Sequence, residues 1–117
     1  MSHNRTLYVD RQGHSISRTT WLALTARPEY VVIASDAVTA EGHHLQVVTI
    51  WLGLNLPIGG PRVFETLLHA AGGRRPRRWA WPSLSRAQAG HRHVVDELMA
   101  GPPAVSGAKS TRTERRR

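Results

Sequence analysis

Two titratable side chains, Glu65 and His91, are the candidates for acid–base chemistry in this 117-residue chain. General acid–base catalysis needs two groups whose surroundings separate their pKa values. Glu65 alternates with Val63 and Leu67, so its carboxylate is expected to face partly inward and to need a partner such as an arginine. His91 falls on the apolar stripe of a helical pattern, where a hydrogen-bonded core histidine is commoner than a base. With no Ser/His/Asp order and no glycine-rich phosphate loop, we predict no catalytic residues and no enzyme activity.

Metal binding has little support in the sequence. The chain has seven histidines and no cysteine, so thiolate sites and disulfides are excluded. His91 and His93 are two residues apart on a predicted helix and point to different faces. His43 and His44 are adjacent at a turn, where two neighbours rarely bind one ion. We therefore predict no metal and no cofactor.

The stretch "VVTIWLGLNLPIGGPRVFET" (47–66) places two apolar runs on either side of a Pro/Gly loop. One interpretation is a turn that only joins two strands. The other is a small pocket, formed where the loop meets the polar and aromatic side chains of the flanking runs. The candidate residues for binding a ligand or partner are Trp51, Asn55, Gly59, Gly60, Glu65 and His91.

The formal net charge is +8, and Lys109 is the only lysine among the 16 basic residues. This bias towards arginine is typical of a GC-rich genome. Two basic clusters, "RRPRR" (74–78) and the C-terminal "RRR", can nevertheless neutralise phosphates without reading sequence, and a following tryptophan can stack on bases. The candidate residues for nucleic-acid binding are Arg74, Arg75, Arg77, Arg78, Trp79, Arg115, Arg116 and Arg117. The other interpretation is a solvated surface, with Trp79 and Trp81 on one face of a strand, on the core or at its edge.

The hydrophobic pattern indicates the elements that must position these residues. Ser17 is a predicted N-cap for a helix ended by Pro28, and Ser83 for a last helix ended at Gly101. Glu41-Gly42 is a predicted turn between two paired strands. The predicted strands cover residues 6–9, 29–40, 44–55, 62–70 and 78–81.

The strand at 44–55 is apolar on both of its faces, so we expect a central strand that is covered on both sides for part of its length. Gly53 within it predicts a bulge or a close backbone approach. The fold class is therefore α+β, with a small antiparallel sheet of four to five strands and a helix near each end. We expect a single domain at 1–101 and a disordered basic tail at 102–117.

Five segments together resemble a known group of proteins: "YVDRQG" (8–13), "TTWLAL" (19–24), "TIWLGLN" (49–55), "GGPRVFETLL" (59–68) and "AGH" (89–91). The combination resembles small uncharacterised proteins encoded by bacteriophages and prophages, common in phages of actinobacteria, over roughly residues 6 to 99. This resemblance implies no established activity. Relatives carry Asp-His where this chain has Asn55-Leu56, so a site built on that pair is lost here.

The sequence leads to two functional hypotheses. The first is a non-catalytic accessory protein of a phage or mobile element that binds a host component, either a host protein or a small nucleotide-like signal. The alternative is non-specific nucleic-acid binding through the basic clusters. No apolar run approaches the roughly 20 residues that span a bilayer, and the N-terminus lacks the apolar core of a signal peptide. We therefore expect no membrane partner and a location in the host cytoplasm.

Overall fold

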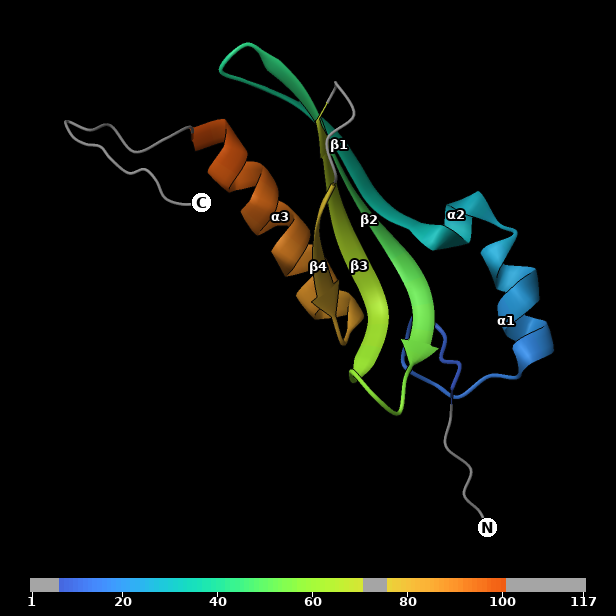
Figure 1. Cartoon of the computed structure of the whole chain (residues 1–117). Coiled ribbons are helices and arrows are strands. Elements are labelled where there is room, and N and C mark those ends of the chain that lie inside the picture. The colour runs from blue at the N-terminus through green and yellow to red at the C-terminus, as the bar shows by residue number, and fades with distance from the viewer. Residues whose placement is uncertain (1–6, 71–75, 101–117) are drawn as a thin grey trace.

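A computed structural model describes residues 7–70 and 76–100 of the chain (Figure 1). The elements are α1 (Arg18–Thr25), α2 (Pro28–Val31), β1 (Val32–Ala40), β2 (His43–Asn55), β3 (Pro61–Ala70), β4 (Arg77–Trp81) and α3 (Leu84–Ala100). The four strands form one antiparallel sheet in the order β1-β2-β3-β4. This arrangement confirms the predicted α+β class. The predicted domain boundary at residue 101 and the basic tail lie outside the described residues.

The hairpin between β1 and β2 follows from its two turn residues. Glu41 and Gly42 both have positive φ, at 52° and 80°. Positive φ at both central residues matches the right-handed twist of the flanking strands, which is why such turns favour glycine. The predicted Glu41-Gly42 turn is thereby confirmed, and it sets the register in which Asp36 pairs with Val47.

The central strand β2 alternates as its sequence predicts, but its two faces differ in burial. Val47, Thr49, Trp51 and Gly53 are buried, whereas the side chains that alternate with them are only half-buried. The half-buried face, which includes Val48 and Ile50, contributes to neither of the two hydrophobic clusters.

Gly53 marks a predicted irregularity that is confirmed. The register of β2 against β3 shifts between Trp51 and Leu54, and Gly53 has φ +69°. A Cβ atom at this position would overlap the Trp51 ring and lie 2.8 Å from the Val9 carbonyl oxygen. Only glycine therefore lets the N-terminal segment cross β2 here.

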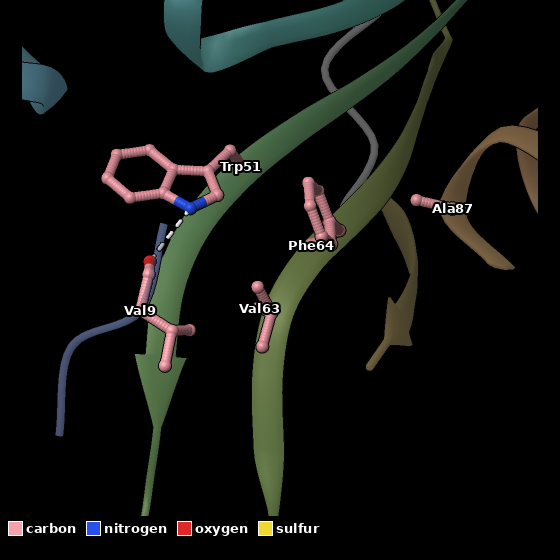
Figure 2. Close-up of a cluster of buried hydrophobic side chains, with 5 residues drawn as sticks. All are labelled: Val9, Trp51, Val63, Phe64 and Ala87. Carbon is pink, nitrogen blue, oxygen red and sulfur yellow. Dashed lines mark hydrogen bonds between the residues drawn. The ribbon is translucent and has the colours of Figure 1, made fainter. Parts of the chain in front are cut away.

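Two hydrophobic clusters hold α3 against the sheet. The first contains Val9, Trp51, Val63, Phe64 and Ala87, and Figure 2 shows the Trp51 Nε1 group pointing at the Val9 carbonyl oxygen, 3.1 Å away. The second contains Val38, Val47 and Val94. Since Ala87 and Val94 both belong to α3, this one helix joins the two clusters.

Two predicted element boundaries are wrong near the N-terminus. Tyr8 and Val9 form isolated bridges to Leu54 and Ser15 instead of a regular strand. The strand predicted from residue 29 begins only at Val32, because residues 28–31 form α2. Proline is well tolerated at the first position of a helix, so Pro28 starts α2, whereas α1 already ends at Thr25.

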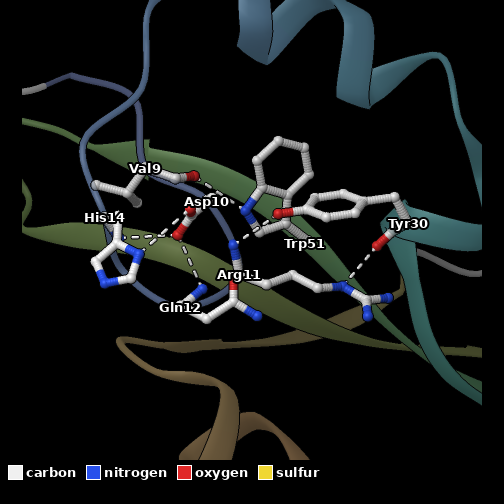
Figure 3. Close-up of polar contacts among 7 residues, drawn as sticks. All are labelled: Val9, Asp10, Arg11, Gln12, His14, Tyr30 and Trp51. Carbon is white, nitrogen blue, oxygen red and sulfur yellow. Dashed lines mark hydrogen bonds and ion pairs between the residues drawn. The ribbon is translucent and has the colours of Figure 1, made fainter.

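The segment "YVDRQG" (8–13) forms a turn that is hydrogen-bonded to α2 (Figure 3). Asp10 Oδ1 accepts hydrogen bonds from the backbone N–H groups of Gln12 and His14, at 2.9 and 2.8 Å. The backbone N–H of Arg11 donates to the Tyr30 hydroxyl at 2.8 Å, and its Nε donates to the Tyr30 carbonyl oxygen at 2.9 Å. Tyr30 in turn packs edge-on against Trp51. The segment therefore has a structural role.

Candidate functional site

A series of hydrogen-bonded polar side chains, called the His91 chain below, runs from β4 across β3 and β2 to His91 on α3 and ends on β1. Trp81 Nε1 donates to Thr66 Oγ1 at 2.9 Å, and the hydroxyls of Thr66 and Thr49 are hydrogen-bonded to each other. Thr49 Oγ1 lies 2.8 Å from His91 Nδ1. His91 Nε2 lies 2.7 Å from Asp36 Oδ2. His91 is only 5% exposed, and it matches the expectation of a hydrogen-bonded core histidine.

For a neutral His91 ring, the two ends of this series fix the direction of each hydrogen bond between them. An indole N–H is only a donor, and an ionised carboxylate is only an acceptor. His91 Nε2 therefore carries the hydrogen that Asp36 accepts. A neutral ring then leaves Nδ1 to accept from Thr49, Thr49 to accept from Thr66, and Thr66 to accept from Trp81. Each donor in the chain has one acceptor when His91 is the neutral Nε2–H tautomer.

Asp36 is the half-exposed end of the His91 chain, in which Thr49, Thr66 and His91 are buried. Its side chain is 52% exposed. It lies in the wall of a depression between α3 and β1, with a volume of about 450 Å³. The depression, called the α3–β1 depression below, is lined by Ile33, Ala34, Asp36, Gln88, His91, Arg92 and Val95.

The polar groups of the α3–β1 depression have opposite charges that are not paired with each other. Asp36 is bound to His91, and no ion pair joins Asp36 to Arg92. Among residues 7–70 and 76–100, no carboxylate lies within ion-pair distance of Arg92. The depression thus combines a hydrogen-bonded carboxylate and an exposed guanidinium with the apolar side chains of Ile33, Ala34 and Val95.

Local sequence features place α3 close enough to the sheet for the hydrogen bonds of the His91 chain to form. Ser83 caps the helix, since its hydroxyl accepts from the Arg86 backbone N–H at 3.3 Å. Gly90 faces the Trp81 ring, which a Cβ atom at this position would overlap. The absence of a side chain at Gly90 therefore allows the next residue, His91, to reach Thr49.

The structure does not bring together the six residues that the sequence suggested for ligand or partner binding. Trp51 is 1% exposed and has its N–H bound to Val9. Asn55, Gly59 and Gly60 lie at or after the end of β2 and do not line the α3–β1 depression. Of the set, only His91 lines it.

Glu65 lies on the opposite face of the sheet from His91. Glu65 directly precedes Thr66 in β3, and successive side chains of a strand point to opposite faces. The Thr66 side chain points toward His91, to which it is linked through Thr49. Glu65 is 5% exposed, and its carboxylate lies 3.8 Å from Nη1 of both Arg62 and Arg78. The predicted arginine partner of Glu65 is thereby confirmed, and Glu65 and His91 do not form one site.

The nucleic-acid candidates are described only in part. Arg74 and Arg75, like Arg115, Arg116 and Arg117, lie outside the described residues. The Arg77 guanidinium lies over the Trp79 ring, 4.9 Å from its centre, and Trp79 packs against the cluster of Val38, Val47 and Val94. In this structure Trp79 therefore contacts the core and Arg77.

Sequence reasoning missed Asp36 and Arg92 as candidate residues. Asp36 had one usable signal, because it lies between Ala34 and Val38 on the face of β1 that α3 covers, where a carboxylate is unexpected. The sequence contains no signal for Arg92, because nothing in it distinguishes an exposed arginine on a helix from the other arginines of this protein.

Comparison of the chain with protein-family models, with curated proteins and with solved structures gave no match. Within the described part of the chain, no three His, Asp or Glu side chains are placed to share a metal ion. No helix of residues 7–70 and 76–100 is long and apolar enough to cross a membrane.

Proposed function

We propose that this chain is a non-catalytic binding protein that holds a small polar molecule in the α3–β1 depression. The observation that carries this proposal is the environment of Asp36. Its carboxylate is held by a buried histidine on one side and lines a depression on the other. A carboxylate oriented in advance loses little freedom when it accepts a hydrogen bond from a ligand, which favours affinity.

The hydroxyls of the His91 chain support binding over catalysis. An Asp/His/hydroxyl series resembles the arrangement that activates a nucleophile. Thr49 and Thr66, however, are both 0% exposed, and Thr49 is enclosed between Thr66 and His91. A hydroxyl with no access to solvent does not reach a substrate, so the chain is better suited to holding Asp36 in place.

The biological setting rests on the resemblance of the sequence to small phage and prophage proteins. We propose an accessory protein that acts in the host cytoplasm, with a small nucleotide-like signal of the host as its ligand in preference to a host protein. A concave site lined by both polar and apolar side chains suits a small molecule better than a protein surface. Non-specific nucleic-acid binding is the weaker candidate, because Trp79 is partly buried against the cluster of Val38, Val47 and Val94 and the Arg77 guanidinium lies over its ring.

The test is a binding screen of the full chain with nucleotides and amino acids, followed by calorimetry on Asp36→Ala. Loss of a charge-assisted hydrogen bond should weaken the dissociation constant by about tenfold or more. Asp96→Ala is the matched control, because Asp96 is an exposed aspartate on α3 that does not line the depression. Binding that Asp36→Ala leaves unchanged would contradict the proposed site.

A further inference from the structure

We propose that the α3–β1 depression binds a guanine nucleotide, with Asp36 accepting hydrogen bonds from the base and Arg92 contacting the phosphate. This inference rests on the proposed function and names the ligand class for the same site. It follows from the direction of the hydrogen bonds in the His91 chain, from the unpaired charge of Arg92 and from the lining of the depression.

Asp36 offers a ligand hydrogen-bond acceptors. Asp36 Oδ2 accepts from His91 Nε2–H at 2.7 Å, and no other residue of the described chain binds Oδ1. Both oxygens of an ionised carboxylate have further acceptor capacity and no hydrogen to donate. The ligand must therefore present donors, and two adjacent N–H donors satisfy both oxygens at once.

Arg92 and the net charge of the chain favour a ligand with an anionic group. A purely cationic donor would satisfy Asp36 but would place its charge near Arg92, which no described carboxylate neutralises. The whole chain carries a formal net charge of +8, which attracts anions. A guanidinium contacts a phosphate through two parallel hydrogen bonds. The ligand is thus expected to carry an anionic group as well as its pair of donors.

The apolar lining and the volume of the depression suit a flat ring. Ile33, Ala34 and Val95 line the same depression and provide apolar contacts for a flat ring. Its volume of about 450 Å³ falls in the range of small-molecule sites. Guanine is the standard base whose Watson–Crick edge has two adjacent N–H donors, at N1 and N2. Adenine has a hydrogen-bond acceptor at N1, and two acceptors that face each other repel, so adenine would not bind the carboxylate in this way.

The experiment is calorimetry of the full chain with guanosine monophosphate, adenosine monophosphate and guanosine at low salt. Guanosine monophosphate should bind at least about tenfold more tightly than either of the other two compounds. Adenosine monophosphate lacks the pair of N–H donors, and guanosine lacks the phosphate. Arg92→Met, which keeps an unbranched side chain, should lower the affinity for guanosine monophosphate to that for guanosine. Equal binding of the adenine and guanine nucleotides would overturn the proposal.

Asp36→Asn provides a test that does not depend on loss of binding. The Asn carbonyl oxygen still accepts from His91 Nε2–H, and its NH₂ group replaces one acceptor with a donor. Xanthine has a donor at N1 and a carbonyl acceptor at C2, so xanthosine monophosphate matches the variant. We expect the preference to switch from guanosine to xanthosine monophosphate. A variant that keeps the guanine preference would overturn the assignment of Asp36 as the residue that contacts the base.

The outcomes separate this inference from the proposed function. If guanine nucleotides fail to bind but another small molecule binds and loses affinity in Asp36→Ala, the guanine assignment is wrong and the proposed function stands. If no small molecule in the screen binds in a way that depends on Asp36, both are wrong.

Discussion

Asp36 on β1 and His91 on α3 are 55 residues apart in the sequence, yet Asp36 Oδ2 and His91 Nε2 lie 2.7 Å apart in the structure. The contact closes the edge of the helix–sheet interface, because β1 is an edge strand of the sheet. It also connects the buried interior with the α3–β1 depression. A structural histidine and the carboxylate of the proposed ligand site are therefore parts of the same hydrogen-bonded series.

Replacement of His91 should destabilise the fold. In His91→Ala, the buried hydroxyls of Thr49 and Thr66 lose the acceptor that ends their chain, and a cavity forms under α3. We expect a loss of about 2–4 kcal/mol in the free energy of unfolding. The measurement is urea denaturation followed by tryptophan fluorescence.

The matched control for this variant is His93→Ala. His93 lies on the same helix with a side chain that is 72% exposed, paired only with Glu97. Its removal should change the free energy of unfolding by no more than about 0.5 kcal/mol. Equal effects of the two substitutions would show that the His91 chain does not stabilise the fold.

The two threonines should behave as one unit. Thr49→Val keeps the shape of the side chain but leaves His91 Nδ1 and the Thr66 hydroxyl without their partner, at a cost of about 1–3 kcal/mol. Once Thr49 is valine, Thr66→Val should cost less than it does alone, because the shared hydrogen bond is already lost. A double-mutant cycle measures this coupling, and strictly additive effects would contradict the proposed chain.

Local patterns in the sequence were sufficient to predict most of the sheet. Gly53 interrupts an alternating apolar run, and it lies at a register shift where no side chain fits. Glu65 alternates with apolar residues, and it is buried beside Arg62 and Arg78. Ser17 precedes a helical pattern, and its side chain accepts from the Thr20 backbone N–H. Each of these features depends on residues close in the chain or on strand alternation.

The candidate site depends on relationships that local patterns do not contain. Whether His91 meets Asp36 or another residue depends on the angle and height at which α3 crosses the sheet. Gly90 and Trp81 set that height, through a contact between two elements. The sequence therefore predicted His91 as a buried, hydrogen-bonded residue but did not identify the carboxylate it binds.

Gly90→Ala tests this account of how α3 is placed. In an exposed helix, the change would increase stability by about 1 kcal/mol, since alanine is the better helix former. Here the added Cβ would overlap the Trp81 ring and push α3 away from β4. We expect a net destabilisation of about 1–3 kcal/mol. Thermal denaturation of Gly90→Ala alone and together with Trp81→Leu, which removes the ring, gives the comparison. A more stable single variant would contradict the close approach.

Glu65→Gln separates the two faces of the sheet. The substitution keeps the size of the side chain and removes the charge that lies 3.8 Å from both Arg62 and Arg78. Because both arginine side chains are about half exposed, water replaces much of the lost interaction, and we expect a cost of about 1 kcal/mol that shrinks at high salt.

The same variant should bind guanosine monophosphate with the affinity of the unchanged chain, because Glu65 points away from the α3–β1 depression. Glu97→Gln is the control, since Glu97 is exposed on α3 and also lies outside the depression. Calorimetry on both variants measures the effect. If Glu65→Gln abolished binding while its unfolding transition stayed close to that of the control, the ligand would lie on the Glu65 face of the sheet. The candidate set that contains Glu65 would then be the better description of the site.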